Sequence, residues 1–456
     1  MSRRQFAVAL GTVTLAALFW RVAYVLVEHR DSGIFGDAWA YHRGANLLAD
    51  GHGFIDAFRY DLTGLEKPSA AHPPLYTLYL AVWSLLGIDT PLGHRLVSTL
   101  LGAAAVLVVG LVARRLAGER AGIAAAIFAA VYPHLWLNDA ALLSESAAAL
   151  AVAVSLLAIE RYRDRPDLAR AAQLGGAFAL ATLTRAELVL LFPLVALPLL
   201  IACGTHDARA RLERLGTAAL VAVVLVGPWV AHNLTRFEEP VTLSNGLGAT
   251  MLGGSCDPAW SGGKLGYWSE LCPTVEVGDG PDEATLARWR ADPEGTRDEV
   301  TAYLTEYART EPDESERDVA SRELALAYVD DHTGRLPVVV AARVGRIWNV
   351  YRPAQNVRFD ADIEGRGSTA SWAALLGYYA LVGMAAVALA RLHRAGRPIW
   401  PYLVLVGIVT FSTAITFGVQ RYRLPVDVAL CVVAGTLFGV PRILGGAPSS
   451  RNEVDA

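Results

Sequence analysis

Long apolar segments without charged residues alternate along the chain with short clusters of arginine. About ten of these segments approach the ~20 residues that a helix needs to cross a ~30 Å hydrocarbon core. They lie at residues 6–27, 94–113, 119–137, 141–159, 170–184, 187–203, 215–232, 370–390, 399–418 and 424–441. Because a helix satisfies its backbone hydrogen bonds internally, this pattern predicts an all-α polytopic membrane protein.

A shorter apolar segment decides the topology. Residues 74–87 (PLYTLYLAVWSLLG) have the length of an interfacial or re-entrant helix. If this segment does not cross, the arginine clusters between the spans lie on the same side as Arg3 and Arg4, as the positive-inside rule requires. These clusters are Arg114/Arg115/Arg120, Arg161/Arg163/Arg165, Arg209/Arg211/Arg214 and Arg391/Arg394/Arg397. We therefore expect cytoplasmic termini, and a first span that is retained rather than cleaved as a signal peptide.

This topology leaves two large outer segments, residues 28–93 and residues 233–369. We divide the chain accordingly into a membrane module that includes the first outer segment (1–232), an extracytoplasmic region of mixed helix and loop (233–369), and C-terminal spans with a short cytoplasmic tail (370–456).

The second outer segment has two distinct parts. Residues 257–330 are polar and mainly acidic, which is typical of a solvated region of helix and loop. Residues 336–351 combine apolar side chains with Arg343 and Arg346, and this pattern predicts an amphipathic helix at the membrane interface. Trp348 and Tyr351 would then be interfacial belt residues.

Composition supports the membrane assignment, since 54% of the residues are hydrophobic and only 18% are charged. The net charge of -4 gives no indication of a nucleic-acid partner. The sequence has no glycine-rich phosphate loop, and none of the expected cytosolic segments is long enough for a nucleotide-sugar-binding domain. Cys256 and Cys272 flank a tryptophan-containing part of the outer region, where they either form a disulfide or remain two reduced thiols.

Candidate chemistry begins in the first outer segment. Asp37 opens a short predicted helix that also carries Tyr41. A carboxylate there is expected to be an N-cap, a role that does not exclude a reactive one. Further on, Lys67 could meet a phosphate as a point charge. His72 could hydrogen-bond a sugar or a phosphate, or it could serve structure alone.

Other charged residues lie at the outer ends of predicted spans. Asp139 and Glu145 would be costly facing lipid, so we expect both to face a cavity shared with Asp37. Arg185 lies two residues before Glu187, where an internal salt bridge and a ligand role are equal alternatives.

The last outer turn carries Arg421 and Arg423, which depart from the positive-inside pattern. Guanidinium groups bind phosphate through two parallel hydrogen bonds, so a phosphate at the outer headgroup level would explain them. Anchoring to ordinary lipid headgroups is the alternative.

Several motifs occur along the chain in a recognisable order: Gly36-Asp37 with Tyr41, His72-Pro73-Pro74-Leu75, Arg95, Arg114-Arg115-Leu116 with Gly118, Pro133, Leu143-Ser144-Glu145, Thr184-Arg185 and Arg421-Tyr422-Arg423-Leu424-Pro425. This set resembles the GT-C glycosyltransferases. More narrowly, it resembles the family that includes protein O-mannosyltransferases and the bacterial aminoarabinose transferases acting on lipid A. The resemblance covers residues 6–232, and less closely residues 370–441.

The resemblance implies a polyprenyl-phosphate sugar as donor and a reaction that inverts the sugar on the extracytoplasmic face. Asp37 takes the role of general base. Glu145 is the second catalytic-site residue, which shapes the acceptor or sugar site and could hold Arg185. The donor phosphate falls to Arg421, with Arg423 and Lys67 as secondary candidates. Tyr41, His72, Asp139 and Arg185 are candidates for the sugar or acceptor site. Members that use lipid monophosphate donors mostly work without a metal, so we expect no metal and no cofactor.

We therefore expect a multi-pass glycosyltransferase of the bacterial inner membrane, whose partners are the lipid-linked donor, membrane lipids and a glycan, lipid or protein acceptor. A transporter or flippase of a lipid-linked sugar is the main alternative, although no internal repeat of the kind common in transporters is visible. A membrane scaffold whose outer region binds a partner is a second alternative.

Overall fold

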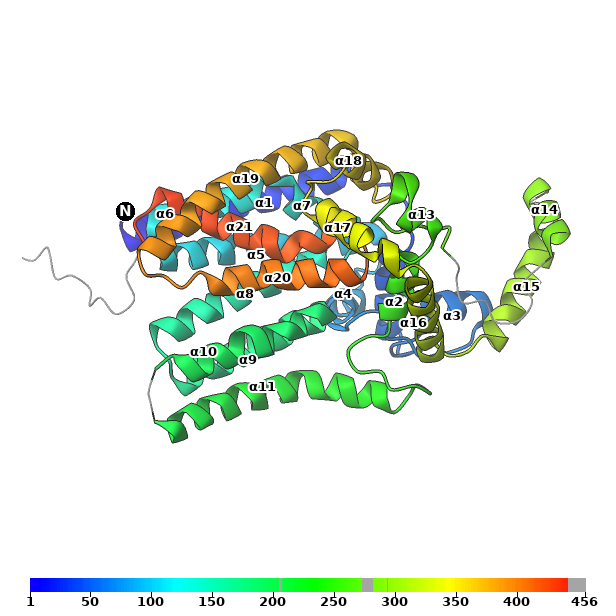
Figure 1. Ribbon diagram of the computed structural model, residues 1–456, viewed down its shortest axis with the longest axis horizontal. Coiled ribbons are helices and arrows are strands. Elements are labelled where there is room, and N and C mark those ends of the chain that lie inside the picture. Colours follow the sequence, from blue (N-terminus) through cyan, green and yellow to red (C-terminus); the bar gives the residue numbers. More distant parts are fainter. Residues whose placement is uncertain (205–206, 273–281, 293, 442–456) are drawn as a thin grey trace, which may run out of the picture.

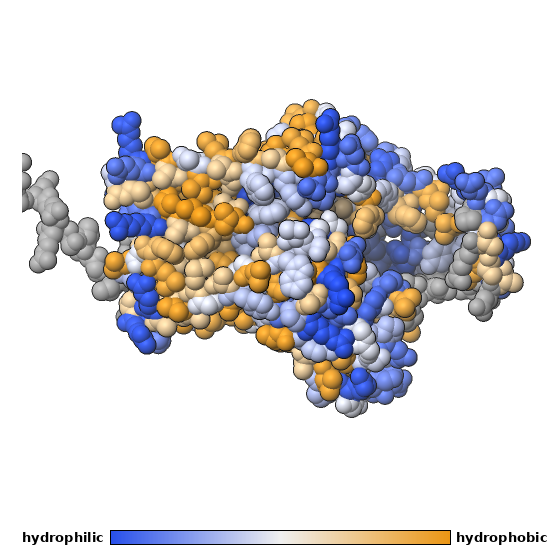
Figure 2. Space-filling view, turned by 90° about the horizontal axis from the view of Figure 1, so that it is seen from above, coloured by the Kyte–Doolittle hydropathy of each residue, from blue (hydrophilic) through white to orange (hydrophobic). Residues whose placement is uncertain are grey.

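The computed structural model describes residues 1–204, 207–272, 282–292 and 294–441, and this part of the chain is helical without a β-sheet. Figure 1 shows long helices running side by side along the long axis, with shorter helices gathered at one end. Apolar side chains cover the flank of the long-helix bundle, and hydrophilic side chains gather over the short helices (Figure 2). This division matches a bundle surrounded by lipid and an outer region in water.

Each of the ten predicted spans overlaps a helix. The long bundle consists of α1 (Arg3–Glu28), α5 (Pro91–Ala117), α6 (Glu119–Val131), α7 (Pro133–Ala141), α8 (Glu145–Asp164), α9 (Leu168–Thr184), η1 (Ala186–Leu190), η2 (Phe192–Ala196), α10 (Leu197–Ala202), α11 (Ala208–Leu234), α19 (Ser368–Arg394), α20 (Trp400–Ile415), η5 (Gln420–Arg423), α21 (Leu424–Gly435) and η6 (Thr436–Phe438).

Four of the described helices, α1, α5, α11 and α19, are long and apolar enough to cross a membrane. The pair α6 and α7 gives a fifth span if its 49° bend lies within one crossing. Several further helices, among them α20, are apolar but shorter. The protein is thus an all-helical, multi-pass membrane protein, and the number of about ten crossings stays a prediction.

The outer region contains α2 (Asp37–Ala49), α3 (Ala57–Thr63), α4 (Leu75–Leu85), α12 (Leu247–Gly253), α13 (Asp257–Trp260), η3 (Gly262–Lys264), α14 (Glu283–Ala291), α15 (Arg297–Thr310), α16 (Glu314–Asp331), η4 (Thr333–Arg335), α17 (Leu336–Ile347) and α18 (Pro353–Asp362). The short apolar segment at residues 74–87 forms α4. The amphipathic segment at residues 336–351 begins with α17.

The arginines of α17 do not reach toward solvent. Both Arg343 and Arg346 are buried. Arg343 donates to the backbone oxygens of Gly254 (2.6 Å) and Ala414 (3.0 Å), and Arg346 donates to the backbone oxygen of Leu265 (2.6 Å). These bonds tie the outer loops to the end of α20.

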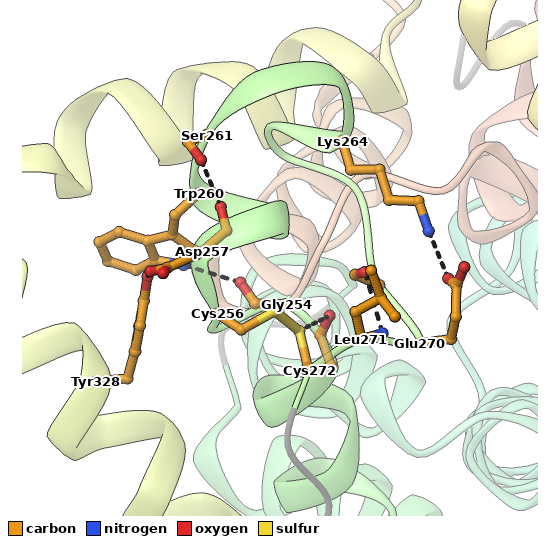
Figure 3. Close-up of a disulfide and its surroundings, with 12 residues drawn as sticks. Gly254, Cys256, Asp257, Trp260, Ser261, Lys264, Glu270, Leu271, Cys272 and Tyr328 are labelled. Atoms are coloured by element: carbon orange, nitrogen blue, oxygen red, sulfur yellow. Dashed lines mark hydrogen bonds and ion pairs between the residues drawn. A yellow bond between two sulfur atoms is a disulfide. The ribbon is translucent and has the colours of Figure 1, made fainter. Parts of the chain in front are cut away.

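Cys256 and Cys272 are joined by a disulfide whose Cα atoms lie 5.3 Å apart (Figure 3). Trp260, which is buried, donates its indole N–H to the backbone oxygen of Gly254 at 2.9 Å. The hydroxyl of Tyr328 donates to Asp257 at 2.7 Å. The disulfide loop is therefore fastened to α16 through Asp257. Among its described residues, the polar stretch contains helices and loops, as predicted.

An ion pair lies inside the bundle, where Arg21 Nε approaches Asp139 Oδ2 at 2.8 Å. Ser146 also donates to Asp139, at 2.5 Å. The pair fits beside α5 only because Gly102 has no side chain, since a Cβ there would lie 2.3 Å from Asp139 Oδ2. Moving two charges out of water is costly unless they approach each other closely. The close approach of Arg21 and Asp139 therefore depends on the space left by Gly102.

Gly102→Ala is therefore expected to lower the free energy of unfolding by about 1–3 kcal/mol, as overpacking of a filled interior does. Gly11→Ala in α1 is the matched control, because a Cβ at Gly11 would meet nothing within 4 Å. The measurement is thermal unfolding of both variants in detergent. Equal unfolding temperatures for the two variants would contradict the assigned role of Gly102.

Candidate functional site

Asp37 is the first residue of α2, directly after Gly36. The cap position belongs to Gly36, which has φ +56°, and no side chain makes a cap hydrogen bond there. The N-cap interpretation of Asp37 is therefore wrong. Its carboxylate instead accepts a hydrogen bond from Arg421 Nη2 at 2.9 Å, across 384 residues of sequence.

Arg421 lies among carboxylates at the outer end of the bundle, in the turn η5. Besides Asp37, Glu364 lies 3.6 Å and Glu145 lies 3.9 Å from its guanidinium nitrogens. Its Nε has no hydrogen-bond acceptor among the described residues. Arg421 thus combines one firm hydrogen bond with two looser ion pairs, and it keeps a donor available for a further oxygen.

Asp37, Glu145, Glu364 and Arg421 form a charged cluster, and Arg185 supplies its second cation. It contacts Glu145 at 3.2 Å and Glu187 at 2.6 Å. The Tyr422 ring lies under both guanidinium groups, 4.9 Å from Arg185 and 5.2 Å from Arg421. Tyr422 therefore holds the two like charges in place through cation–π contacts.

Glu145 is buried, with 3% of its side chain exposed. Arg185→Leu is expected to lower the free energy of unfolding by about 3 kcal/mol, because it leaves a buried carboxylate without its close partner. Thermal unfolding in detergent measures the loss. The double variant Arg185→Leu with Glu145→Leu should regain most of it, and a double variant as unstable as Arg185→Leu would argue against the pair.

His72 and Tyr41 form the side of the cluster that faces the outer region. His72 Nε2 lies 3.7 Å from Asp37 Oδ1, and its ring stacks on Tyr41 with centroids 4.6 Å apart. Tyr41 is buried in one apolar cluster with Leu142 and Leu143, just before Glu145. The first outer segment and the turn before α8 are therefore linked through these two rings.

The charges set the protonation state of Asp37. Burial opposes its ionisation, but the positive charge of Arg421, followed by that of His72, outweighs burial and lowers the pKa of Asp37 below its usual value. Burial lowers the pKa of His72, against the attraction of Asp37. At neutral pH the cluster thus presents an ionised Asp37 beside a neutral imidazole.

The structure places three predicted site residues elsewhere. Arg423 is buried, pairs with Asp427 at 3.1 Å and lies over the Tyr378 ring at 3.7 Å. Asp139 is paired with Arg21 inside the bundle, so it does not share a cavity with Asp37. Lys67 lies outside the cluster, where its backbone oxygen accepts from the Asp56 N–H and its backbone N–H donates to the Leu65 oxygen.

Two members of the cluster were not predicted from the sequence. Glu364 follows the end of α18, and no sequence pattern there predicted that it would meet Arg421. Tyr422 lies between the two predicted arginines, and an aromatic ring flanked by arginines at a membrane surface would have been a usable signal.

A cavity of about 890 Å³ opens next to the cluster. Gly36, Tyr41 and His72 line its inner end, and α12 and α16 contribute much of its outer wall. Groups of three or more His, Cys, Asp or Glu that could hold a metal ion do not occur among the described residues.

Comparisons with known proteins bear on this arrangement. Residues 71–232 match the family model described as dolichyl-phosphate-mannose-protein mannosyltransferase. A comparison with curated proteins gives no match.

Two solved structures stand among the matches. The archaeal oligosaccharyltransferase AglB of Archaeoglobus fulgidus, solved with an inhibitory peptide and a dolichol-phosphate, has a TM-score of 0.51 and 14% identity over 96% of this chain and 50% of its own. ArnT from Cupriavidus metallidurans, solved with undecaprenyl phosphate, has a TM-score of 0.39 and 14% identity over 96% of this chain and 78% of its own. The chain thus spans about half the length of AglB, with which it shares a fold.

The resemblance predicted from the sequence is confirmed: over residues 71–232 the chain matches the dolichyl-phosphate-mannose-protein mannosyltransferase family, on a helical scaffold shared with an archaeal oligosaccharyltransferase.

Proposed function

We propose that this protein transfers a sugar from a polyprenyl-phosphate carrier to an acceptor hydroxyl on the extracytoplasmic face of the bacterial inner membrane. The observation that carries the proposal is the contact of Asp37 with Arg421 at 2.9 Å. It sets a carboxylate that can take a proton beside a cation that can bind a phosphate. The family match over residues 71–232 supports the same chemistry.

In this reaction the acceptor oxygen attacks the anomeric carbon of the sugar as the bond from that carbon to the phosphate oxygen breaks. The bonding electrons leave with the polyprenyl phosphate, the acceptor proton passes to Asp37, and the sugar is inverted. His72 lies 3.7 Å from Asp37 and is neutral, so it can orient the carboxylate or donate a hydrogen bond to the sugar.

Arg421 has the contacts expected of a phosphate-binding residue. Its Nε is unpaired among the described residues, and its contacts with Glu145 and Glu364 are too long for hydrogen bonds. The donor phosphate can therefore replace these looser contacts. Because the phosphate neutralises Arg421, its arrival also raises the basicity of Asp37. The Tyr422 ring lies under the Arg421 guanidinium, and the Tyr422 hydroxyl accepts a hydrogen bond from Arg421 Nη2 at 3.4 Å.

The test is incubation of purified protein in lipid nanodiscs with radiolabelled polyprenyl-phosphate sugars. A glycosyltransferase releases or transfers the sugar and leaves polyprenyl phosphate. A flippase leaves the donor intact, and in liposomes it moves the donor between leaflets. Intact donor across a panel of sugars, together with movement between leaflets, would replace this proposal with the transporter.

A further inference from the structure

The outer region encloses the cavity of about 890 Å³ that begins beside Asp37. Its inner end contains Gly36, Tyr41 and His72, and its far wall contains residues from α12, α15 and α16. Figure 2 shows hydrophilic side chains around a hollow at this end of the molecule. The walls therefore come partly from the mainly acidic stretch at residues 257–330.

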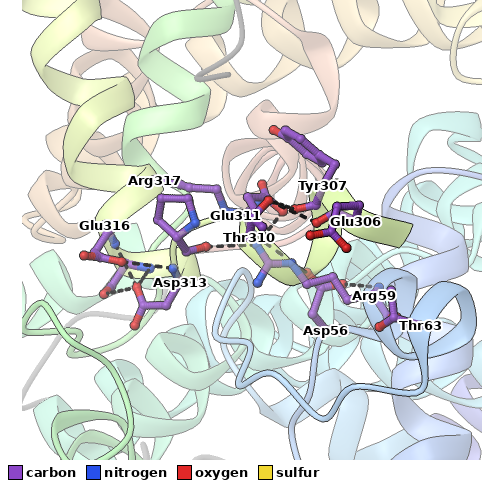
Figure 4. A network of polar contacts seen from close by, with 12 residues as sticks. Asp56, Arg59, Thr63, Glu306, Tyr307, Thr310, Glu311, Asp313, Glu316 and Arg317 are labelled. Carbon is purple, nitrogen blue, oxygen red and sulfur yellow. Dashed lines mark hydrogen bonds and ion pairs between the residues drawn. The ribbon is translucent and has the colours of Figure 1, made fainter. Parts of the chain in front are cut away.

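The ionisable side chains that line the cavity are mainly acidic. They are Asp56, Glu270, Glu311, Glu314 and Asp318, with Arg317 and His72 as the basic residues. Arg317 is already engaged, since it forms ion pairs with Glu311 and Asp56 (Figure 4). Arg59 also pairs with Glu311 and Asp56, and Lys264 pairs with Glu270. The carboxylates still outnumber these cations, so the cavity disfavours an anionic ligand relative to an uncharged or cationic one.

Two residues in the cavity wall carry buried polar atoms without partners among the described residues. The side-chain amide of Asn245 is buried, and neither its nitrogen nor its oxygen has a hydrogen-bond partner among the described residues. Glu314 Oε1 lacks a partner in the same way. Buried polar atoms in native proteins are nearly always bonded, so these groups indicate a ligand or ordered water.

The two residues that carry these unpaired atoms both bond to the backbone of Ala70. The backbone N–H of Asn245 donates to the oxygen of Ala70 at 3.0 Å, and the N–H of Ala70 donates to Glu314 Oε2 at 3.1 Å. Two residues further along, His72 approaches Asp37 at 3.7 Å. Residues 70–72 thus lead from the residues with unpaired atoms to Asp37 in the charged cluster.

Aromatic rings complete the lining. Trp39, Phe58 and Trp268 all border the cavity. Phe58 is 59% exposed, and it meets the edge of Trp39 with centroids 6.4 Å apart. Aromatic faces combined with amide and carboxylate groups suit a sugar ring, because its C–H faces pack on the rings and its hydroxyls bond to the polar groups.

We propose that this cavity is the acceptor site and that it binds an uncharged or amino sugar of a glycan. The acceptor role rests on the proposed function, whereas the preference for sugars rests on the lining alone. The ring sits against Phe58 and Trp39, and Asn245 and Glu314 bind its hydroxyls. One hydroxyl then points past His72 to Asp37.

A peptide acceptor fits the cavity less well. Extended peptides commonly pair with a strand edge through their backbone. The described residues offer a single isolated bridge, between Ile55 and Pro68, and the remaining lining comes from helices and loops.

Saturation-transfer NMR with purified protein in nanodiscs tests binding without any turnover. The probes are methyl glycosides of neutral hexoses, N-acetylglucosamine, glucosamine, glucuronic acid, glucose 6-phosphate and a serine/threonine peptide. We expect the neutral and amino sugars to bind, and Asn245→Leu and Glu314→Gln to weaken this binding about tenfold. Phe58→Ala, at an exposed position, gives a third variant that should fold even if the others do not.

Glu323→Gln is the matched control, because Glu323 is exposed on α16 and does not line the cavity. Preferred binding of glucuronate, glucose 6-phosphate or the peptide would overturn the proposal, and so would absence of binding by every neutral and amino sugar. Unchanged affinity in all three cavity variants would also overturn it. If sugars bind as expected while wild-type protein consumes no donor, the proposed function fails and the sugar site stands.

Discussion

Replacing Asp37 with asparagine is expected to lower the rate of sugar transfer by about 10²- to 10⁴-fold, the usual contribution of a positioned general base. The amide keeps the size of the carboxylate, and its oxygen can still accept the hydrogen bond that Arg421 makes at 2.9 Å. It cannot take up the acceptor proton. The measurement is the initial rate of transfer from a polyprenyl-phosphate sugar by purified protein in lipid nanodiscs.

Asp50→Asn is the matched control, because Asp50 is exposed at the C-terminal cap of the same helix, α2. It should transfer sugar at the wild-type rate. Both variants should unfold at the wild-type temperature, which separates loss of a base from loss of the fold. Transfer by Asp37→Asn within about threefold of wild type would show that another group accepts the proton.

The membrane-spanning helices were the most predictable part of the fold, because lipid demands apolar residues over the whole length of a crossing. Their breaks had local signals as well. Pro133 begins α7 at the 49° bend after α6. Pro193 lies in the π-helical turn η2, and Pro198 lies in the following α10. Proline removes a backbone donor, so a helix with several prolines departs from regular geometry.

The meeting of Asp37 with Arg421 followed from topology. Asp37 was assigned to the first outer segment and Arg421 to the last outer turn, so both were expected on the outer face of the membrane. The contacts of the outer region had no comparable constraint. Arg59 pairs with Glu311 at 2.5 Å across 252 residues (Figure 4), and no local pattern in the sequence predicts that contact.

Two site predictions failed to place residues in the cluster because a backbone turn changes the direction of a side chain. Leu142 has φ +59°, so α8 starts in a new direction after α7. Asp139 consequently points to Arg21 while Glu145 points to Arg185. In the same way Arg423 leaves the turn η5 toward Asp427, four residues ahead, and that spacing was visible in the sequence.

Arg421→Gln is expected to lower kcat/KM for the donor by about 10²- to 10³-fold, as removal of one preorganised donor to a developing charge does. Its guanidinium contacts Asp37, Glu145 and Glu364 in the free protein. Glutamine retains a hydrogen-bond donor but no positive charge, so the departing phosphate loses its counter-charge. Arg421→Lys should recover part of the loss, because it restores a point charge without the planar fork.

The pH dependence of the same variant separates electrostatic support of Asp37 from a merely structural role of Arg421. In the wild type, Arg421 and His72 lower the pKa of Asp37 against the effect of burial. Asp37 accepts a proton only when ionised, so wild-type kcat/KM should stay level through neutral pH and fall only in acid. Without Arg421, burial raises the pKa of Asp37, and the acid limb of the profile should move toward neutral pH. Arg421→Lys should move it less.

An acid limb at the wild-type position in Arg421→Gln would mean that Arg421 does not control the charge of Asp37. Loss of activity would then be assigned to phosphate binding alone.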